Sequence, residues 1–320
     1  MKLALIGYGH VGRAFARLLE RKRSAFPFRI TGIHTARHGT AVDDKGLPLA
    51  PAFGPQAASA EEFLDKVKAE VVLEISPLNP STGEPAISHI RAAFARRLHV
   101  VTANKGPIAI AYAALREEAE RAGVQFRFEA TVMDGAPVFN LMRATLPGAE
   151  LRGFSGVLNS TTTVVLEALR EGFSLAEGVE RARRMGITEA DPSFDIDGWD
   201  AAAKTAALAN VLMDARVTPQ AVDTRGITRL TPERVMALGA KGKTVRLVSR
   251  ARRTPAGVRL RVRAEVLPQD DLLASVRGTS NLLLLDTDLM GTIGVISLSP
   301  AVEQTAYGLF SDVVAVAREA

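Results

Sequence analysis

The chain has 320 residues, with 40 Lys and Arg against 35 Asp and Glu, so its formal net charge is +5. This length is enough for two domains, and the hydrophobic fraction of 47% is ordinary for a globular protein. Cysteine is absent, which excludes disulfides, thiolate metal sites and cysteine nucleophiles. No apolar run approaches the ~18 residues of a membrane-spanning helix, and no nucleic-acid reading motif is present. The short N-terminal apolar run lacks a signal-peptide cleavage site, so we expect a cytoplasmic protein. Asn and Gln are few and arginine is abundant, which is typical of proteins adapted to heat.

The first part of the chain alternates strand-like and helix-like segments. Apolar strands are predicted at residues 2–7, 28–35, 70–76, 99–104 and 124–132. Amphipathic helices are predicted at 10–23, 59–68, 84–97 and 107–122. This alternation predicts an α/β fold, a Rossmann doubly wound parallel sheet. We assign residues 1–130 to this domain and expect residues 301–320, which include a last helix, to complete it.

The regular alternation of predicted strands and helices ends at about residue 130. Helices are predicted at 160–171, 174–184, 198–213 and 232–240, and strands near 150–158, 244–252, 257–266 and 292–298. The segment around Pro255 and Gly257 predicts a hairpin with arginines on alternate positions. These arginines form either a basic patch or a solvated strand face, and the lack of interleaved aromatics favours the solvated face. We therefore predict a second α+β domain over residues 131–300.

A glycine-rich turn follows the first predicted strand. Gly7, Gly9 and Gly12 have the GxGxxG spacing and open the first predicted helix. Gly7 permits the tight turn, Gly9 lets the backbone approach a pyrophosphate, and Gly12 allows close packing of helix on strand. The helix N-terminus attracts the anion. The motif therefore predicts a dinucleotide site, with His10 and Val11 inside the fingerprint as cofactor neighbours.

The end of the second predicted strand bears on the choice between NAD and NADP. An acidic residue usually holds the ribose 2′-hydroxyl of NAD, but the chain has no Asp or Glu between Glu20 and Asp43. Arg37 and His38 follow the strand instead. Because an arginine can pair with a 2′-phosphate, we predict NADP as the preferred cofactor and NAD as the alternative. An exposed loop arginine without a ligand is the other interpretation of Arg37.

The segment HVVTANKGP, residues 99–107, resembles homoserine dehydrogenases. By this resemblance Lys105, at the end of a strand, is both a cofactor contact and a catalytic lysine. Ser76 and Pro77 match the family's segment beside the nicotinamide. GVLNSTTTVVL, residues 156–166, is similar to the family's GILNGTTNYIL, and Thr161 is carried over as a substrate neighbour.

Two further segments depart in part from the family pattern. FEATVMDGAPV, residues 128–138, is similar to a segment that binds a monovalent cation in relatives, Na⁺ or K⁺, and the matching positions are Glu129, Val132, Asp134 and Ala136. Asp134 stands where small residues are usual. The glycine-rich loop that precedes the family's last helix has lost its glycines, and Ala301 aligns with one of these cofactor contacts. The resemblance also implies a short form without an appended regulatory domain.

The segment DPSFDIDGWDAAAKTAALAN, residues 191–210, matches the family's substrate and catalytic region. The resemblance implies that Glu189 and Asp200 bind the substrate, that Gly186 supplies a backbone contact, and that Asp195 is a supporting acid. Lys204 is then the general acid or base, assisted by Lys105. Asp200 and Lys204 are four residues apart and share one face of a helix. An exposed ion pair is the alternative, but the nearly uncharged surroundings of Lys204 favour an enclosed site.

The resemblance implies an NAD(P)-dependent oxidoreductase that interconverts L-homoserine and L-aspartate 4-semialdehyde. It places this small-molecule reaction in the biosynthesis of threonine, methionine and isoleucine, and implies a homodimer built through the second domain. Two alternatives remain at this point: another small Rossmann amino-acid or semialdehyde dehydrogenase, and a non-catalytic regulator that senses NADP. The five histidines show no metal-ligand spacing, so a zinc-dependent alcohol dehydrogenase is not favoured.

Overall fold

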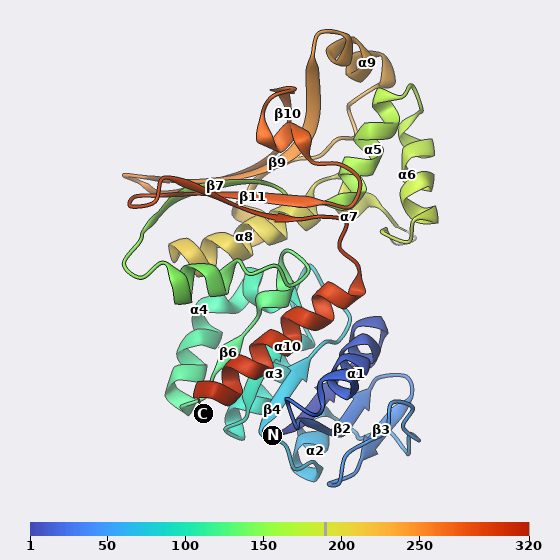
Figure 1. Cartoon of the computed structure of the whole chain (residues 1–320), viewed down its shortest axis with the longest axis vertical. Helices are drawn as coiled ribbons and strands as arrows, with labels where there is room; N and C mark the ends of the chain where they lie inside the picture. Colours follow the sequence, from blue (N-terminus) through green and yellow to red (C-terminus); the bar gives the residue numbers. More distant parts are fainter. Residues whose placement is uncertain (189–190, 320) are drawn as a thin grey trace. The chain divides into compact units, whose positions relative to one another are not determined.

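The computed structural model describes residues 1–188 and 191–319. The chain divides into two compact units (Figure 1). The first contains Met1–Asn140 and the segment that starts at Ala301, and the second contains Leu141–Pro300. Each unit has its own six-stranded sheet. No helix in the described part of the chain is long and apolar enough to cross a membrane.

The sheet of the first unit has the order β3-β2-β1-β4-β5-β6. Its strands are β1 (Lys2–Ile6), β2 (Arg29–Thr35), β3 (Gly39–Val42), β4 (Val71–Glu74), β5 (His99–Thr102) and β6 (Phe126–Arg127). β1 pairs in parallel with both β2 and β4, so the strand order reverses between β1 and β4. The predicted doubly wound parallel sheet is confirmed, and β3 adds an antiparallel edge strand that the sequence did not reveal.

The predicted strand at 124–132 is wrong over most of its length. Only β6 joins the sheet, and Glu129–Thr131 form a 3₁₀ turn. The backbone turns away because the Glu129 N–H donates to the Asp312 carboxylate at 2.7 Å. The Glu129 carboxylate in turn accepts N–H groups of residues 138–140. These tertiary bonds replace the ladder that a longer strand would form.

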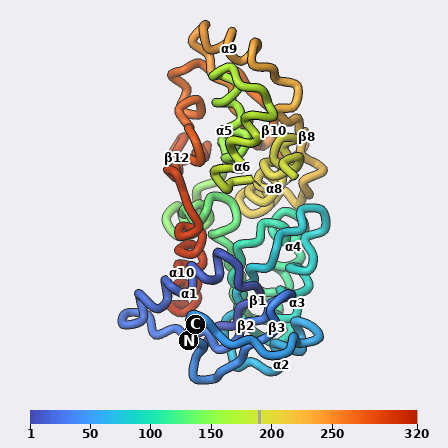
Figure 2. The backbone as a smooth tube through the Cα atoms, turned by 90° about the vertical axis from the view of Figure 1, so that its right-hand side faces the viewer, coloured from blue at the N-terminus to red at the C-terminus, as the bar shows by residue number. Residues whose placement is uncertain are grey.

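Helices cover both faces of the first sheet. They are α1 (His10–Lys22), α2 (Ala60–Lys66), α3 (Ala86–Ala95), α4 (Lys105–Ala122) and α10 (Val302–Glu319). Alternate residues of β1 point to opposite faces. Leu3 and Leu5 pack in the core with α1 and α10, which run side by side (Figure 2). Ala4 and Ile6 pack in the core that includes α2, α3 and α4. Two buried cores therefore fix the strand ends that position the glycine turn.

The sheet of the second unit has the order β12-β11-β7-β9-β10-β8. Its strands are β7 (Leu151–Val157), β8 (Asp223–Arg225), β9 (Lys243–Thr254), β10 (Gly257–Pro268), β11 (Asn281–Thr287) and β12 (Thr292–Ser297). Its helices are α5 (Ser160–Arg170), α6 (Leu175–Arg184), α7 (Ser193–Ile196), α8 (Trp199–Met213) and α9 (Pro232–Ala240). The predicted hairpin is β9–β10, whereas β8 and β11 were not predicted. α8 packs on β9 and β10, and α5 packs on β9 (Figure 1).

Candidate active site

The glycine turn of the first unit has the geometry that a dinucleotide requires. Gly7 has φ +106°, and an added Cβ would lie 2.3 Å from the Ile75 carbonyl oxygen, so only glycine fits. A Cβ on Gly12 would meet the Ile75 side chain at 3.1 Å, which reflects close helix packing. A Cβ on Gly9 would meet nothing within 4 Å, so the space outside this residue is open.

The start of α1 suits a phosphate group. Gly9 is the N-cap residue, no side chain caps the helix, and no acid lies in its first turn. The first N–H groups of a helix have no intrahelical acceptor and carry a partial positive charge. With the open space at Gly9, these N–H groups fit the pyrophosphate of a dinucleotide cofactor.

A pocket of about 160 Å³ lies beside this helix start. It is lined by Val11, Ile75, Ser76, Leu78, Ala103, Asn104, Lys105 and Thr305. Except for Thr305 of α10, these residues follow β4 and β5 or begin α1, so the pocket lies at the carboxyl ends of the strands, where the strand order reverses. Open α/β sheets bind their ligands at this point.

Three of the predicted cofactor residues, Val11, Ser76 and Lys105, line this pocket. Sequence reasoning missed Asn104, whose Oδ1 accepts the Gly106 N–H at 3.1 Å and caps α4 in front of Lys105. The signal was available, because an asparagine directly before a predicted helix is a preferred N-cap. Thr305 was also missed as a lining residue, since it belongs to the last helix of the chain.

Besides the three glycines of the turn, four predicted cofactor residues lie outside the lining of this pocket. His10, Pro77, Arg37 and Ala301 are all exposed. Arg37 lies in the turn between β2 and β3, beside His38, whose N–H donates to Thr35 Oγ1 at 2.8 Å. Ala301 directly precedes α10, and its N–H donates to Gln304 Oε1 at 2.9 Å.

The second unit gathers two acids around one buried amide. Asn159 Nδ2 donates to Asp195 Oδ1 at 2.7 Å and to Asp200 Oδ2 at 2.9 Å. Asn159 Oδ1 accepts the Thr162 N–H at 2.8 Å and so caps α5. Burial raises the pKa of Asp195, and the nearby Asp200 carboxylate raises it further. Asn159 is a functional candidate that sequence reasoning passed over, although it lies within the motif that carried the resemblance.

Lys204 reaches the same group of acids from α8. Its Nζ lies 3.2 Å from Asp200 Oδ2 and donates to the Leu158 carbonyl oxygen at 2.6 Å. The Lys204 side chain is only 17% exposed, and Asp200 is buried. The i,i+4 pair is therefore not an ordinary solvated ion pair, and it places a proton-bearing amine beside a carboxylate.

The remaining substrate candidates differ in their positions. The Thr161 hydroxyl donates to the Ile187 carbonyl at 3.0 Å and lies close to the Asp195 carboxylate. Gly186 has φ +71° and ends the turn after α6, in an exposed position. Glu189 lies outside the described residues. The second unit thus brings together Thr161, Asp195, Asp200 and Lys204.

The candidate cation segment centres on Glu129, which is buried. Oε1 accepts the N–H groups of Val138 at 2.6 Å and Phe139 at 2.9 Å, and Oε2 accepts that of Asn140 at 2.6 Å. Burial raises the pKa of Glu129 to about 7, against the opposing effect of these N–H bonds. A carboxylate with backbone carbonyls is the oxygen donor set that Na⁺ or K⁺ takes, and Oε2 keeps a lone pair for it. No group of three or more metal-ligating side chains occurs in residues 1–188 and 191–319.

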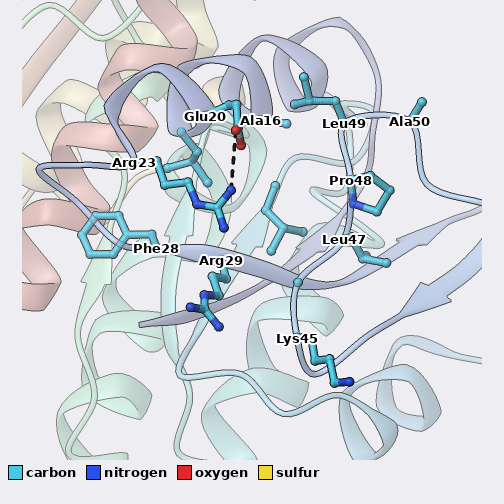
Figure 3. A pocket seen from close by; sticks show the side chains of 13 residues that line it. Ala16, Glu20, Arg23, Phe28, Arg29, Lys45, Leu47, Pro48, Leu49 and Ala50 are labelled. Atoms are coloured by element: carbon cyan, nitrogen blue, oxygen red, sulfur yellow. Dashed lines mark ion pairs between the residues drawn. The ribbon is translucent and has the colours of Figure 1, made fainter.

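A larger groove, of about 620 Å³, lies between α1 and residues 45–50 (Figure 3). Its lining includes Leu47, Pro48 and the start of β2, so it lies at the amino end of that strand. Arg23 points into the groove and pairs with Glu20 at 3.6 Å. Because ligands of open α/β sheets bind at the carboxyl ends of the strands, we assign this groove no part in cofactor binding.

Comparison with known sequences and structures agrees with these features. Residues 7–129 match the family "Homoserine dehydrogenase, NAD binding domain", and residues 137–314 match the family "Homoserine dehydrogenase". A homoserine dehydrogenase of Methanocaldococcus jannaschii is 34% identical, with 98% of each chain covered. An NAD(+)-dependent homoserine dehydrogenase of Pseudomonas canavaninivorans is 33% identical, over 100% of this chain and 97% of that one.

Solved structures lead to the same result. The crystal structure of a homoserine dehydrogenase from Thiobacillus denitrificans aligns with a TM-score of 0.87 and 29% identity. The alignment covers 99% of this chain and 73% of that chain. These matches do not favour the two alternatives, another small dehydrogenase or a non-catalytic regulator. The chain belongs to the homoserine dehydrogenase family.

Proposed function

We propose that the chain interconverts L-homoserine and L-aspartate 4-semialdehyde, with Lys204 as the group that exchanges a proton with the substrate oxygen. The observation that carries this proposal is the position of the Lys204 amine, 3.2 Å from Asp200 and largely withdrawn from solvent. An amine held beside an acid in a partly enclosed site suits general acid–base chemistry.

The other site residues have supporting roles in this proposal. Asp200 and Glu189 bind the substrate ammonium group, and Thr161 and Gly186 flank it. Asp195 orders Asp200, because Asn159 donates to both carboxylates. The nicotinamide cofactor supplies or accepts the hydride when it is bound. Lys105, from the pocket of the first unit, assists proton transfer or positions a water molecule.

A direct assay tests the proposal. The protein is mixed with L-homoserine and either NADP or NAD, and the absorbance of the reduced cofactor is followed. We expect turnover with at least one cofactor. Binding of NADP without turnover would mean that the chain acts as a sensor, and turnover only with a different amino alcohol would reassign the substrate.

We also propose NADP as the preferred cofactor. Arg37 is exposed at the turn after β2, and residues 21–42 contain no acid that would hold a ribose 2′-hydroxyl. We expect Arg37→Ala to raise the KM for NADP about tenfold and leave that for NAD nearly unchanged, since one charged contact to phosphate is lost. Arg225→Ala, which alters an exposed arginine of the second unit, is the matched control. Equal KM changes for both cofactors would sink this assignment.

The edge of the second sheet supports a homodimer. β12 is an edge strand, and Ile296 and the following Leu298 are 53% and 72% exposed. An apolar edge strand of this kind tends to pair with another chain, and we propose a second copy of this protein as its occupant. Light scattering should give the mass of a dimer, and Ile296→Lys should give a monomer. A wild-type monomer at micromolar concentration would contradict the proposal.

The setting of the reaction follows from the same resemblance. We propose a cytoplasmic enzyme in the branch toward threonine, methionine and isoleucine. Its expression should restore growth of a bacterium that lacks homoserine dehydrogenase on minimal medium, and failure with soluble, active protein would count against this setting. The composition leads us to propose a thermal midpoint above the ~45–65 °C of mesophilic domains, which calorimetry would measure.

A further inference from the structure

Glu74 is a fully buried carboxylate that does not line the cofactor pocket. It is the last residue of β4 and lies between Ile6 of β1 and Thr102 of β5 in the parallel sheet. A carboxylate with no access to water is costly unless protein donors satisfy it. Its position at the carboxyl end of a central strand, directly behind the pocket, calls for an explanation.

Donors converge on one oxygen of this carboxylate. Oε1 accepts the Ser76 N–H at 3.2 Å and, in a short hydrogen bond, the Ser76 hydroxyl. His89 Nδ1 lies 3.3 Å from the same oxygen. Oε1 is a carboxylate oxygen with no hydrogen of its own, so the Ser76 hydroxyl directs its hydrogen toward it.

This bond determines what Ser76 offers on its other side. A hydroxyl has one hydrogen and two lone pairs. With the hydrogen directed to Glu74, Ser76 Oγ has only lone pairs left, and Ser76 is among the residues that line the pocket beside Lys105. One of the residues that line the pocket therefore has a hydroxyl that accepts further hydrogen bonds and does not donate them.

Glu74 also supports the second strand end of this pocket. The Thr102 hydroxyl donates to the Glu74 carbonyl at 2.8 Å and lies 3.2 Å from Oε2. It accepts the Asn104 N–H at 2.9 Å, and Asn104 caps the helix that begins at Lys105. One buried residue thus fixes the ends of both β4 and β5.

We infer that Glu74 is a positioning residue that keeps Ser76 as a hydrogen-bond acceptor for the carboxamide NH₂ of the nicotinamide ring. The inference rests on the proposed function, in which this pocket receives that ring. The carboxamide has an NH₂ group that donates and a carbonyl oxygen that accepts. A hydroxyl that can only accept binds the NH₂ group and not the carbonyl oxygen. The ring then presents a defined face for hydride transfer.

The test compares two cofactors that differ at this one group. NADPH has the carboxamide, whereas reduced 3-acetylpyridine adenine dinucleotide phosphate has a methyl ketone with no N–H donor. Their affinities are measured by fluorescence titration without substrate. We expect wild-type protein to favour NADPH about tenfold, the value of one hydrogen bond whose loss leaves a buried acceptor unsatisfied. A wild type that binds both equally, or favours the analogue, overturns the inference whatever the variants do.

Three variants assign the effect to Glu74. Ser76→Ala removes the acceptor and should bring the affinity ratio close to one. Glu74→Met frees the Ser76 hydrogen to donate to the ketone and should also abolish the preference. Glu74→Gln keeps an acceptor oxygen for Ser76 and should retain it. Ser81→Ala, an exposed serine of the same loop, should behave as wild type.

The ratio separates this role from a merely structural one. If Glu74 only holds the fold together, Glu74→Met weakens both cofactors equally, and the unchanged ratio refutes our inference. Circular dichroism checks that each variant is folded, and the Ser76→Ala and wild-type ratios decide the question should Glu74→Met not fold. Because these titrations need no homoserine, their outcome is independent of the turnover assay that tests the proposed function.

Discussion

Two buried carboxylates, Glu129 in the first unit and Asp200 in the second, are satisfied by different kinds of donor. Glu129 of the first unit is held by backbone N–H groups of residues 138–140, at 2.6–2.9 Å. Asp200 of the second unit is held by the Asn159 amide and the Lys204 amine. Backbone N–H groups fix a carboxylate in place but release no proton, whereas an amine carries a full charge and an exchangeable proton. The first arrangement is suited to hold a segment of chain, and the second is suited to react.

The largest expected effect comes from the reactive group. Lys204→Ala should lower kcat about 10²–10⁴-fold, the range for loss of a general acid or base. The dissociation constant for the cofactor should change by less than about twofold, or ~0.4 kcal/mol, because Lys204 is not among the residues that line the cofactor pocket. Stopped-flow rates and cofactor titration measure the two quantities.

A matched lysine shows whether the effect is specific. Lys241 is exposed after α9 in the same unit, and Lys241→Ala should leave kcat unchanged. If Lys204→Ala instead weakens cofactor binding and leaves kcat unchanged, the lysine belongs to the cofactor site. Asp200 would then have no part in the reaction, and its contrast with Glu129 would not hold.

Glu129 should make the free energy of unfolding depend on pH. The pKa of Glu129 is raised from 4.5 to about 7, chiefly by burial, so between these values the folded state binds more protons than the unfolded state. Its contribution to the free energy of unfolding is therefore fully present below about pH 4.5 and is lost as the pH rises through about 7. This difference corresponds to about 3 kcal/mol as an upper value, measured by urea unfolding at several pH values.

Glu129→Gln should remove this pH dependence while lowering stability at every pH, because an amide cannot accept all three N–H groups. Glu303→Gln, at an exposed position of α10, should retain the wild-type profile. An identical slope in wild type and Glu129→Gln would show that the raised pKa does not contribute to stability.

The next largest effect is expected from removal of the Asn159 amide, which binds both acids of the second unit. Asn159→Ala removes the donor shared by Asp195 and Asp200 and leaves two carboxylates side by side. We expect the KM for homoserine to rise about tenfold, as for a lost hydrogen bond to a charged group, with cofactor affinity unchanged. Asn210→Ala is the control, since that buried amide binds the Val217 backbone instead. Equal KM values in both variants would exclude a substrate-ordering role for Asn159.

Much of this fold was predictable because periodicity is a local property. The glycine spacing, the helix at 10–23 and the hairpin around Pro255 follow from patterns within short windows. The antiparallel strand β3 and the turn at Glu129 did not, since each depends on partners far along the chain. The apolar run of β11 was missed because it lacks the alternation of a half-buried strand.

The site shows the same division. The positions of Asp200 and Lys204 on one helix face followed from their spacing, and on α8 the two side chains form an ion pair. The bridging role of Asn159 depends on Asp195 and Asp200, which lie 36 and 41 residues further along the chain. A hydrogen-bond network of this kind produces no periodic pattern in the sequence. The sequence therefore showed Asn159 only as one letter of the motif at residues 156–166. The hydrogen bonds behind Ser76 were hidden for the same reason.

The smallest effect concerns a monovalent cation at Glu129. A cation that binds only the folded state stabilises it, by about 1 kcal/mol when its concentration is a few times the dissociation constant. At about pH 8 Glu129 is largely ionised, whereas at about pH 6 a proton occupies it and competes with the cation. NaCl or KCl should therefore raise the thermal midpoint relative to choline chloride of equal ionic strength at pH 8, and by less at pH 6. If all three salts act alike at both pH values, or if Glu129→Gln keeps the response, the three backbone N–H groups suffice and this carboxylate holds chain rather than an ion.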